Sequence, residues 1–178
     1  MKKPPAIFLD RDGTLIEDNG YLHHPSEVQF FPYTFQVLRA LQEHFFLFIV
    51  TNQSGIAKGI TSETEVMAVN RHIVETLQRE EITLLEFYYC PHKTEDRCNC
   101  KKPHPHFLQL AAQRYGLDLA KSFIIGDHPS DVECGLNAGV TPLYLLTGHG
   151  QKHKNELPPD IAIFSNLSDA SEFILTSI

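Results

Sequence analysis

The sequence predicts an α/β fold in three layers, with a mainly parallel sheet covered by helices on both faces. Short, continuous apolar runs such as residues 6–9 and 46–50 have the length and character of strands buried on both faces. These runs alternate along the chain with segments of helical periodicity, which is the order of elements expected for a parallel sheet. The 178 residues suffice for a substantial core, and we expect one domain over residues 1–178.

Each helix is predicted from its periodicity and its ends. Residues 35–43 have apolar side chains at positions 35, 37, 38 and 41, which form one helical face. Ser62 with Glu65 three residues later is a capping box, and Gly116 suits a C-terminal cap. In chain order we expect strand 6–9, helix 35–43, strand 46–50, helix 62–80, strand 87–89, helix 106–115, strand 123–125, helix 131–138, strands 142–146 and 161–164, and a helix from residue 168.

Polar side chains follow several of the expected strands at the point where each strand ends. In parallel sheets, ligands bind beyond the carboxyl ends of the strands, so these side chains should meet at one edge. We therefore expect one functional site there. The residues concerned are Asp10, Asp12, Thr51, Asn52, Cys90, His92, Asp127 and Asp131.

Composition narrows the classes of function. Hydrophobic residues make up 42% of the chain and charged residues 21%, as in soluble globular proteins. The net charge of -7 argues against nucleic-acid binding, which leaves a basic footprint. We find neither a targeting signal nor a stretch long enough to span a membrane. By default we expect a cytoplasmic monomer that binds neither membrane nor nucleic acid. The acidic charge does not exclude a small phosphorylated metabolite as the substrate, because a few local cations and a metal can bind one.

The segment Asp10-Arg11-Asp12-Gly13-Thr14 directly follows the first expected strand. Two carboxylates at this spacing can divide a phosphoryl transfer: one attacks phosphorus and the other handles the proton of the leaving group. Gly13 permits the tight turn that points both side chains into one site. A solvated acidic turn is the alternative interpretation, because Asp and Gly are common in turns.

Three later segments offer groups suited to phosphate and a metal. Residues 51–55 follow the second strand, where hydroxyl and backbone N–H groups can hold phosphate oxygens. Lys102 supplies a cation that can offset phosphoryl charge. Asp127, at the end of the fourth strand, and Asp131 offer the hard oxygen ligands that suit Mg²⁺. Taken singly, they could also be a polar loop, a solvated lysine, and an N-cap at Asp131.

Three cysteines and a histidine crowd together between residues 90 and 100. Cys90, His92, Cys98 and Cys100 make a full tetrahedral ligand set for Zn²⁺, and a closed set of this kind marks a structural site. Zinc can fold a loop that lacks an apolar core of its own. The alternative is a group of free thiols beside a chance histidine. The separate Cys134, inside an expected helix, is interpreted as a small core residue.

In this order the segments resemble the haloacid dehalogenase (HAD) superfamily of phosphohydrolases over residues 6–146. The most specific mark is Asp-x-Asp-Gly-Thr after the first strand. The resemblance implies the Rossmann-like HAD fold, with Asp10 as the nucleophile that forms an aspartyl-phosphate. Asp12 would protonate the leaving alkoxide and then deprotonate the attacking water. Thr51 and Lys102 would hold the transferring phosphoryl group.

The same resemblance implies a catalytic magnesium ion. It would bind the side chains of Asp10 and Asp127 and the backbone carbonyl of Asp12. Asp131 would orient Lys102 or a metal-bound water. Relatives commonly carry a cap domain after the first strand or the second. This chain has no long insertion at either place, so we expect an open site completed by short loops.

Within the superfamily the chain is similar to the D-glycero-D-manno-heptose 1,7-bisphosphate 7-phosphatases. The similar segments are residues 8–14, 18–23, 51–59, 88–92 and 102–105. The similarity implies hydrolysis of the C7 phosphate during synthesis of the activated heptose of lipopolysaccharide core or related glycans. The residues implied to touch the substrate are Asp18, Asn19, Gly20, Tyr21, Thr51, Asn52, Gln53, Ser54, Lys101, Lys102 and His128.

Some features depart from that family and keep alternatives open. Lys101 stands where Arg is usual, and His128 where Lys is frequent, which predicts a weaker hold on the distal C1 phosphate. The zinc loop is short, as in histidinol-phosphate phosphatases, the main alternative. A polynucleotide 3′-phosphatase is opposed by the acidic charge. A binding module without catalysis is opposed by the complete set of Asp10, Asp12, Thr51, Lys102 and Asp127.

Overall fold

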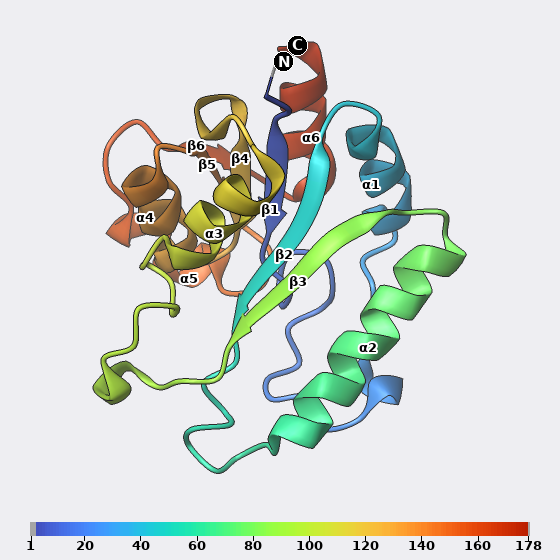
Figure 1. Cartoon of the computed structure of the whole chain (residues 1–178), viewed down its shortest axis with the longest axis vertical. Coiled ribbons are helices and arrows are strands. Elements are labelled where there is room, and N and C mark those ends of the chain that lie inside the picture. Colours follow the sequence, from blue (N-terminus) through green and yellow to red (C-terminus); the bar gives the residue numbers. More distant parts are fainter. Residues whose placement is uncertain (1–2, 178) are drawn as a thin grey trace.

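The computed structural model describes residues 3–177 and contains one sheet of parallel strands in the order β3-β2-β1-β4-β5-β6 (Figure 1). Fully buried apolar side chains fill the central strands, because a parallel sheet covered on both faces exposes neither side. The predicted α/β class is confirmed. The strands are β1 (Ala6–Leu9), β2 (Phe46–Asn52), β3 (Leu84–Cys90), β4 (Phe123–Gly126), β5 (Thr141–Leu145) and β6 (Ala162–Phe164).

Helices cover both faces of the sheet and bury an apolar cluster on each (Figure 1). One cluster joins the sheet to α1 (Thr34–Gln42), α2 (Glu63–Arg79) and α6 (Leu167–Thr176). The other joins it to α3 (His106–Tyr115) and α4 (Pro129–Ala138), and includes the buried side chain of Cys134, as predicted. In residues 3–177, no helix is both long and apolar enough to cross a membrane.

The direction of strand order reverses at the centre of the sheet. From β1 the chain proceeds outward to β2 and β3, and then returns to place β4 on the other side of β1. The loops that follow β1 and β4 therefore diverge and leave a crevice at their carboxyl ends, where ligands bind in open α/β sheets. Of regular elements, the segment between β1 and β2 holds only α1 and the short 3-10 helix η1 (Pro25–Glu27), so no cap domain is inserted there.

Local signals predicted some helix ends correctly and one incorrectly. Ser62 and Glu65 form the expected capping box of α2, and Gly116 ends α3 in the left-handed conformation. The N-cap of α4 is His128 rather than Asp131. Asp131 instead lies in the first turn, where its Oδ2 accepts the backbone N–H of His128 at 3.1 Å. The short helix α5 (Gly150–His153) was not expected.

Candidate active site

An open pocket of about 800 Å³ lies at the carboxyl ends of the strands. The predicted catalytic and substrate-binding residues line it, with the exception of Asn19, which is exposed and outside the lining. The lining residues lie on the segments that follow β1, β2, β4 and β5 and on the loop between β3 and α3. Residues from distant parts of the sequence therefore converge at the point where the strand order reverses.

The centre of the pocket is built around one buried ammonium group. Lys102 is 3% exposed, and its Nζ donates to Asp10 Oδ1 at 2.8 Å, to Asp131 Oδ1 at 2.6 Å and to the carbonyl of Val50 at 2.7 Å. These bonds occupy every N–H of the ammonium group. Burial alone would lower the pKa of Lys102, but the carboxylates of Asp10 and Asp131 outweigh burial and raise its pKa well above the ordinary value.

Asn52 fixes the backbone of Lys102 through two direct hydrogen bonds. Its amide Nδ2 donates to the carbonyl of Lys102 at 3.2 Å, and its Oδ1 accepts the backbone N–H of Lys102 at 3.0 Å. Both ends of the amide are thus engaged with the protein. Asn52 was predicted to touch the substrate, and the structure gives its side chain the additional task of positioning a lysine fifty residues further along the chain.

Three carboxylates form a possible metal site. Asp10, Asp127 and Asp131 each offer an oxygen, and these oxygens lie within 4.8 Å of one another. Lys102 brings one positive charge to this group. Burial, followed by the charges of Asp10 and Asp131, raises the pKa of Asp127 to about 9. Hard oxygen ligands with uncompensated negative charge are the environment that Mg²⁺ requires, so the residues present fit this ion.

The walls around Asp127 leave no room for larger residues. Gly13 has φ +76°, and a Cβ at this position would overlap the carboxylate of Asp127. The same is true of Gly148, whose neighbour His149 donates its backbone N–H to Asp127 Oδ2 at 2.7 Å. The segment after β5 thus holds the metal-site carboxylate in place. This segment was not predicted to belong to the site, because its position after a strand is its only signal in the sequence.

The carboxylate of Asp12 is held by side chains on two sides. Arg11 donates to both of its oxygens, from Nε to Oδ2 at 2.8 Å and from Nη2 to Oδ1 at 3.0 Å. Gln53 Nε2 donates to Asp12 Oδ2 and to the hydroxyl of Thr51, both at 3.0 Å. Burial raises the pKa of Asp12 above its ordinary value, although Arg11 acts in the opposite direction.

Loops and cations form the rim of the pocket. His149 Nε2 lies 2.8 Å from Asp18 Oδ2, and Lys58 Nζ donates to the hydroxyl of Tyr21 at 3.2 Å. These contacts tie the loop after β1 to the segments after β5 and β2. Lys101 was predicted to touch the substrate. Three further basic residues of the lining were not predicted, because a sequence does not show which side chains face a pocket: Lys58, Lys93 and Arg97.

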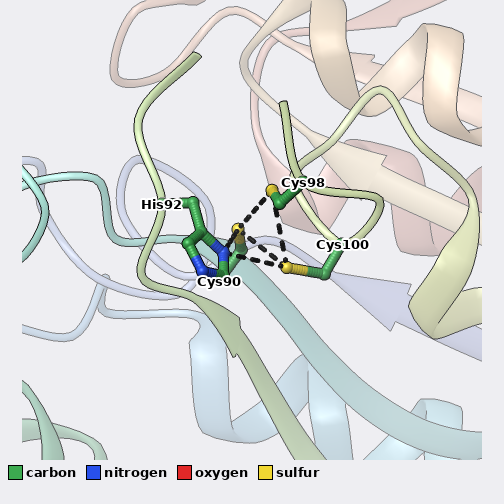
Figure 2. A group of neighbouring side chains, drawn as sticks. All are labelled: Cys90, His92, Cys98 and Cys100. Carbon is green, nitrogen blue, oxygen red and sulfur yellow. Dashed lines mark hydrogen bonds between the residues drawn. The ribbon is translucent and has the colours of Figure 1, made fainter. Parts of the chain in front are cut away.

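Figure 2 shows the cysteine and histidine cluster at the end of β3. The Sγ atoms of Cys90, Cys98 and Cys100 lie 3.1 to 3.7 Å apart, and His92 Nδ1 is 3.6 Å from Cys90 Sγ and 3.4 Å from Cys100 Sγ. Tetrahedral zinc with bonds of about 2.3 Å separates sulfur ligands by roughly 3.8 Å, whereas a disulfide requires about 2.05 Å. The donors therefore fit a closed, structural Zn²⁺ site.

Protein purified without chelator should contain one equivalent of zinc, which elemental analysis can measure. With zinc bound, we expect the loop cysteines to resist alkylation at pH 8 and to react after chelation. Cys134 should stay unreactive in the folded chain, because burial raises its pKa to about 12. Cys100→Ala should lose the metal, while the control Cys134→Ala should keep it. Zinc-free wild-type protein would contradict the prediction.

Fold and site together define a class. A parallel sheet with Asp10, Lys102 and Asp127 at the carboxyl ends of its strands is the arrangement of HAD-like hydrolases. A family model described as HAD-hydrolase-like matches residues 99–170.

Curated relatives narrow the class to a family. A D-glycero-beta-D-manno-heptose-1,7-bisphosphate 7-phosphatase from Pasteurella multocida (strain Pm70) is 37% identical over 175 residues, which are 91% of this chain and 94% of the relative. The D-glycero-alpha form of the enzyme from Campylobacter jejuni is 35% identical, covering 81% and 83%. This chain belongs to the D-glycero-D-manno-heptose-1,7-bisphosphate 7-phosphatase family.

A solved structure agrees with this membership. The D,D-heptose 1,7-bisphosphate phosphatase from B. bronchiseptica, crystallised with magnesium and phosphate, superposes with a TM-score of 0.89. Its sequence is 29% identical, and the match covers 98% of this chain and 99% of that one. The fold of the two chains is therefore the same from end to end of the match.

Proposed function

We propose that the chain removes the C7 phosphate of D-glycero-D-manno-heptose 1,7-bisphosphate through an aspartyl-phosphate on Asp10. The observation that carries this proposal is the position of Asp10. Its carboxylate lies on the floor of an open pocket, 2.8 Å from the buried Lys102 ammonium group and beside Asp127. Relatives of the family supply the identity of the sugar, since two that match over most of the chain carry this name.

In the first step an oxygen of Asp10 attacks phosphorus, and the bond from phosphorus to the sugar oxygen breaks. Asp12 gives its proton to that departing oxygen. In the second step Asp12, now a carboxylate, takes a proton from the water that hydrolyses the aspartyl-phosphate. Inorganic phosphate leaves and both carboxyl groups return to their starting states. Thr51 would hold the phosphoryl oxygens, and the positive charge of Lys102, whose N–H groups are donated to Asp10, Asp131 and Val50, would offset their negative charge.

The side chains of Asp10 and Asp127 and the backbone carbonyl of Asp12 would hold Mg²⁺. When bound, the ion neutralises the charge that keeps an anionic phosphate away from carboxylates. Asp131 lies 2.6 Å from the Lys102 ammonium group and orients it. We further propose that Zn²⁺ shapes the loop between β3 and α3, whose residues Lys93 and Arg97 line the pocket.

The distal C1 phosphate would meet the cationic rim. Lys101 and His128 were predicted to touch the substrate, and Lys58, Lys93 and Arg97 add positive charge on the same pocket. These side chains compensate for the arginine that is absent at position 101. Histidinol phosphate, the alternative substrate, carries a protonated amine where the sugar carries a phosphate. The cationic rim therefore disfavours it.

The decisive test is kcat/KM for heptose 1,7-bisphosphate and for histidinol phosphate, measured side by side with Mg²⁺. We expect the heptose to be preferred by about a hundredfold, equivalent to about 2.7 kcal/mol of transition-state discrimination. Heptose 7-phosphate, which lacks the distal charge, should fall between them. A preference for histidinol phosphate would reject the sugar while leaving the chemistry of Asp10 standing.

We also propose that the chain acts as a single hydrolase domain and as a monomer. Strands from both halves of the chain join one continuous sheet, as one domain requires. Light scattering at assay concentrations measures the mass of the active species.

A further inference from the structure

Arg11 is a charged residue for which the sequence alone predicts no role. It is 1% exposed and does not line the pocket, so it meets neither substrate nor solvent. Burying a guanidinium group is costly unless its N–H groups find partners. Here each of its nitrogens donates a hydrogen bond, two of them to the neighbouring carboxylate of Asp12. The buried guanidinium group of Arg11 therefore serves mainly to hold the side chain of Asp12.

The hydrogen bonds to the Asp12 carboxylate leave one of its lone-pair sites without a donor. A carboxylate has about four lone-pair sites, two on each oxygen. The paired contact from Arg11 uses one site on Oδ1 and one on Oδ2, and Gln53 uses the second site on Oδ2. The remaining site is on Oδ1. A proton that Asp12 exchanges with substrate or water would therefore travel through Oδ1.

The third nitrogen of the Arg11 guanidinium group is bonded to a residue in the helical layer that contains α2. Its Nη1 donates at 2.8 Å to Oδ1 of Asn70, which lies on the buried face of α2 between apolar neighbours. Asn70 is 7% exposed. A helix that contributes no residue to the pocket lining thus supports the orientation of a pocket side chain.

We propose that Arg11 is the positioning residue for the proton-transfer group Asp12, and that Asn70 completes this support from α2. The inference rests on the proposed function, because it requires Asp12 to protonate the leaving oxygen. Rotation of the carboxyl group would turn Oδ1 away from that oxygen, and proton transfer requires hydrogen-bond reach. The fork of Arg11 prevents this rotation, whereas a lysine could make only a point contact.

Two substrates can distinguish a loss of Asp12 positioning from general damage to the active site. The sugar oxygen of heptose 1,7-bisphosphate is a poor leaving group and needs the proton, whereas 4-nitrophenolate departs without one. The quantity to compare is kcat/KM, which reports the steps up to bond cleavage. Arg11→Lys should lower it on the order of a hundredfold for the sugar and less than about fivefold for 4-nitrophenyl phosphate, given the usual contribution of general acids.

Asn70→Ala should show the same selectivity at roughly a tenth of the size, and it leaves the guanidinium group of Arg11 in place, so it serves if Arg11→Lys fails to fold. Val69→Ala is its control, because Val69 is the adjacent buried residue on α2 and has no hydrogen bond to Arg11. The control should leave the ratio of the two substrates unchanged. An equal loss on both substrates in the Arg11 and Asn70 variants, or no loss, overturns the inference.

Asp12→Asn sets the reference for the acid itself. If this variant loses the sugar activity selectively while Arg11→Lys and Asn70→Ala do not, the positioning role is wrong and the proposed function stands. If Asp12→Asn shows no selectivity, then Asp12 is not the acid, and the positioning role of Arg11 is wrong with it. The aspartyl-phosphate on Asp10 is tested separately, by Asp10→Asn.

Discussion

Replacement of Asp10 by asparagine is expected to abolish turnover, with kcat falling by roughly four orders of magnitude or more, as when other enzymes lose their nucleophile. The amide cannot form the acyl-phosphate, although it matches the carboxylate in shape. The chain should remain folded. Lys102 keeps its bonds to Asp131 and to the carbonyl of Val50 when its bond to Asp10 is weakened.

Unfolding temperatures of the wild type and the Asp10→Asn variant, measured with and without Mg²⁺, test whether the variant is folded and whether Asp10 binds the metal. Without Mg²⁺ the variant should unfold at the same temperature as the wild type or higher, because Asp10 adds to the negative charge that raises the pKa of Asp127. With Mg²⁺ the wild type should gain more stability than the variant, which lacks one proposed ligand. Substantial turnover by a homogeneous preparation of the variant would exclude Asp10 as the nucleophile.

Lys102→Met should lose activity and also destabilise the fold by about 3–5 kcal/mol, the usual result of removing one partner from a buried ion pair. The carboxylates of Asp10 and Asp131 would remain without their shared cation. Chemical denaturation followed by circular dichroism measures the change.

Lys101→Met is the matched control for this loss of stability. Lys101 is the adjacent residue, is partly exposed and also lines the pocket. We expect its replacement to change stability by less than about 0.5 kcal/mol, as at most surface positions. Equal destabilisation by the two variants would show that the buried network around Lys102 contributes little to the free energy of unfolding.

The strands, and the convergence of Asp10, Asp12 and Asp127, could be predicted because both depend on local sequence patterns. Strand β1 has the predicted bounds, since its four apolar residues end abruptly at Asp10. Strand β3 was predicted three residues too short at its beginning and one at its end. Its half-buried residues include Glu86, which obscures the apolar pattern at the edge of a sheet. Asp10, Asp12 and Asp127 each follow a strand, so their meeting followed from the topology.

The supporting contacts could not be predicted, because they join groups that only the tertiary structure brings together. Arg11 resembles any exposed charge in a loop until α2 covers it and supplies Asn70. The amide of Asn52 gave no sign that it would hold the backbone of Lys102. His149 has no recognisable motif, and its contact with Asp127 depends on β5 lying beside β4.

The pairing of β1 with β4 makes metal binding depend on how far folding has progressed. Asp10 and Asp127 are separated by more than a hundred residues, and their carboxylates share a site only when β4 pairs with β1. An intermediate that has formed β1, β2 and β3 alone would have Asp10 but not Asp127 in place, and would have little affinity for Mg²⁺. The rate of Mg²⁺ uptake during refolding would therefore report when β4 pairs with β1.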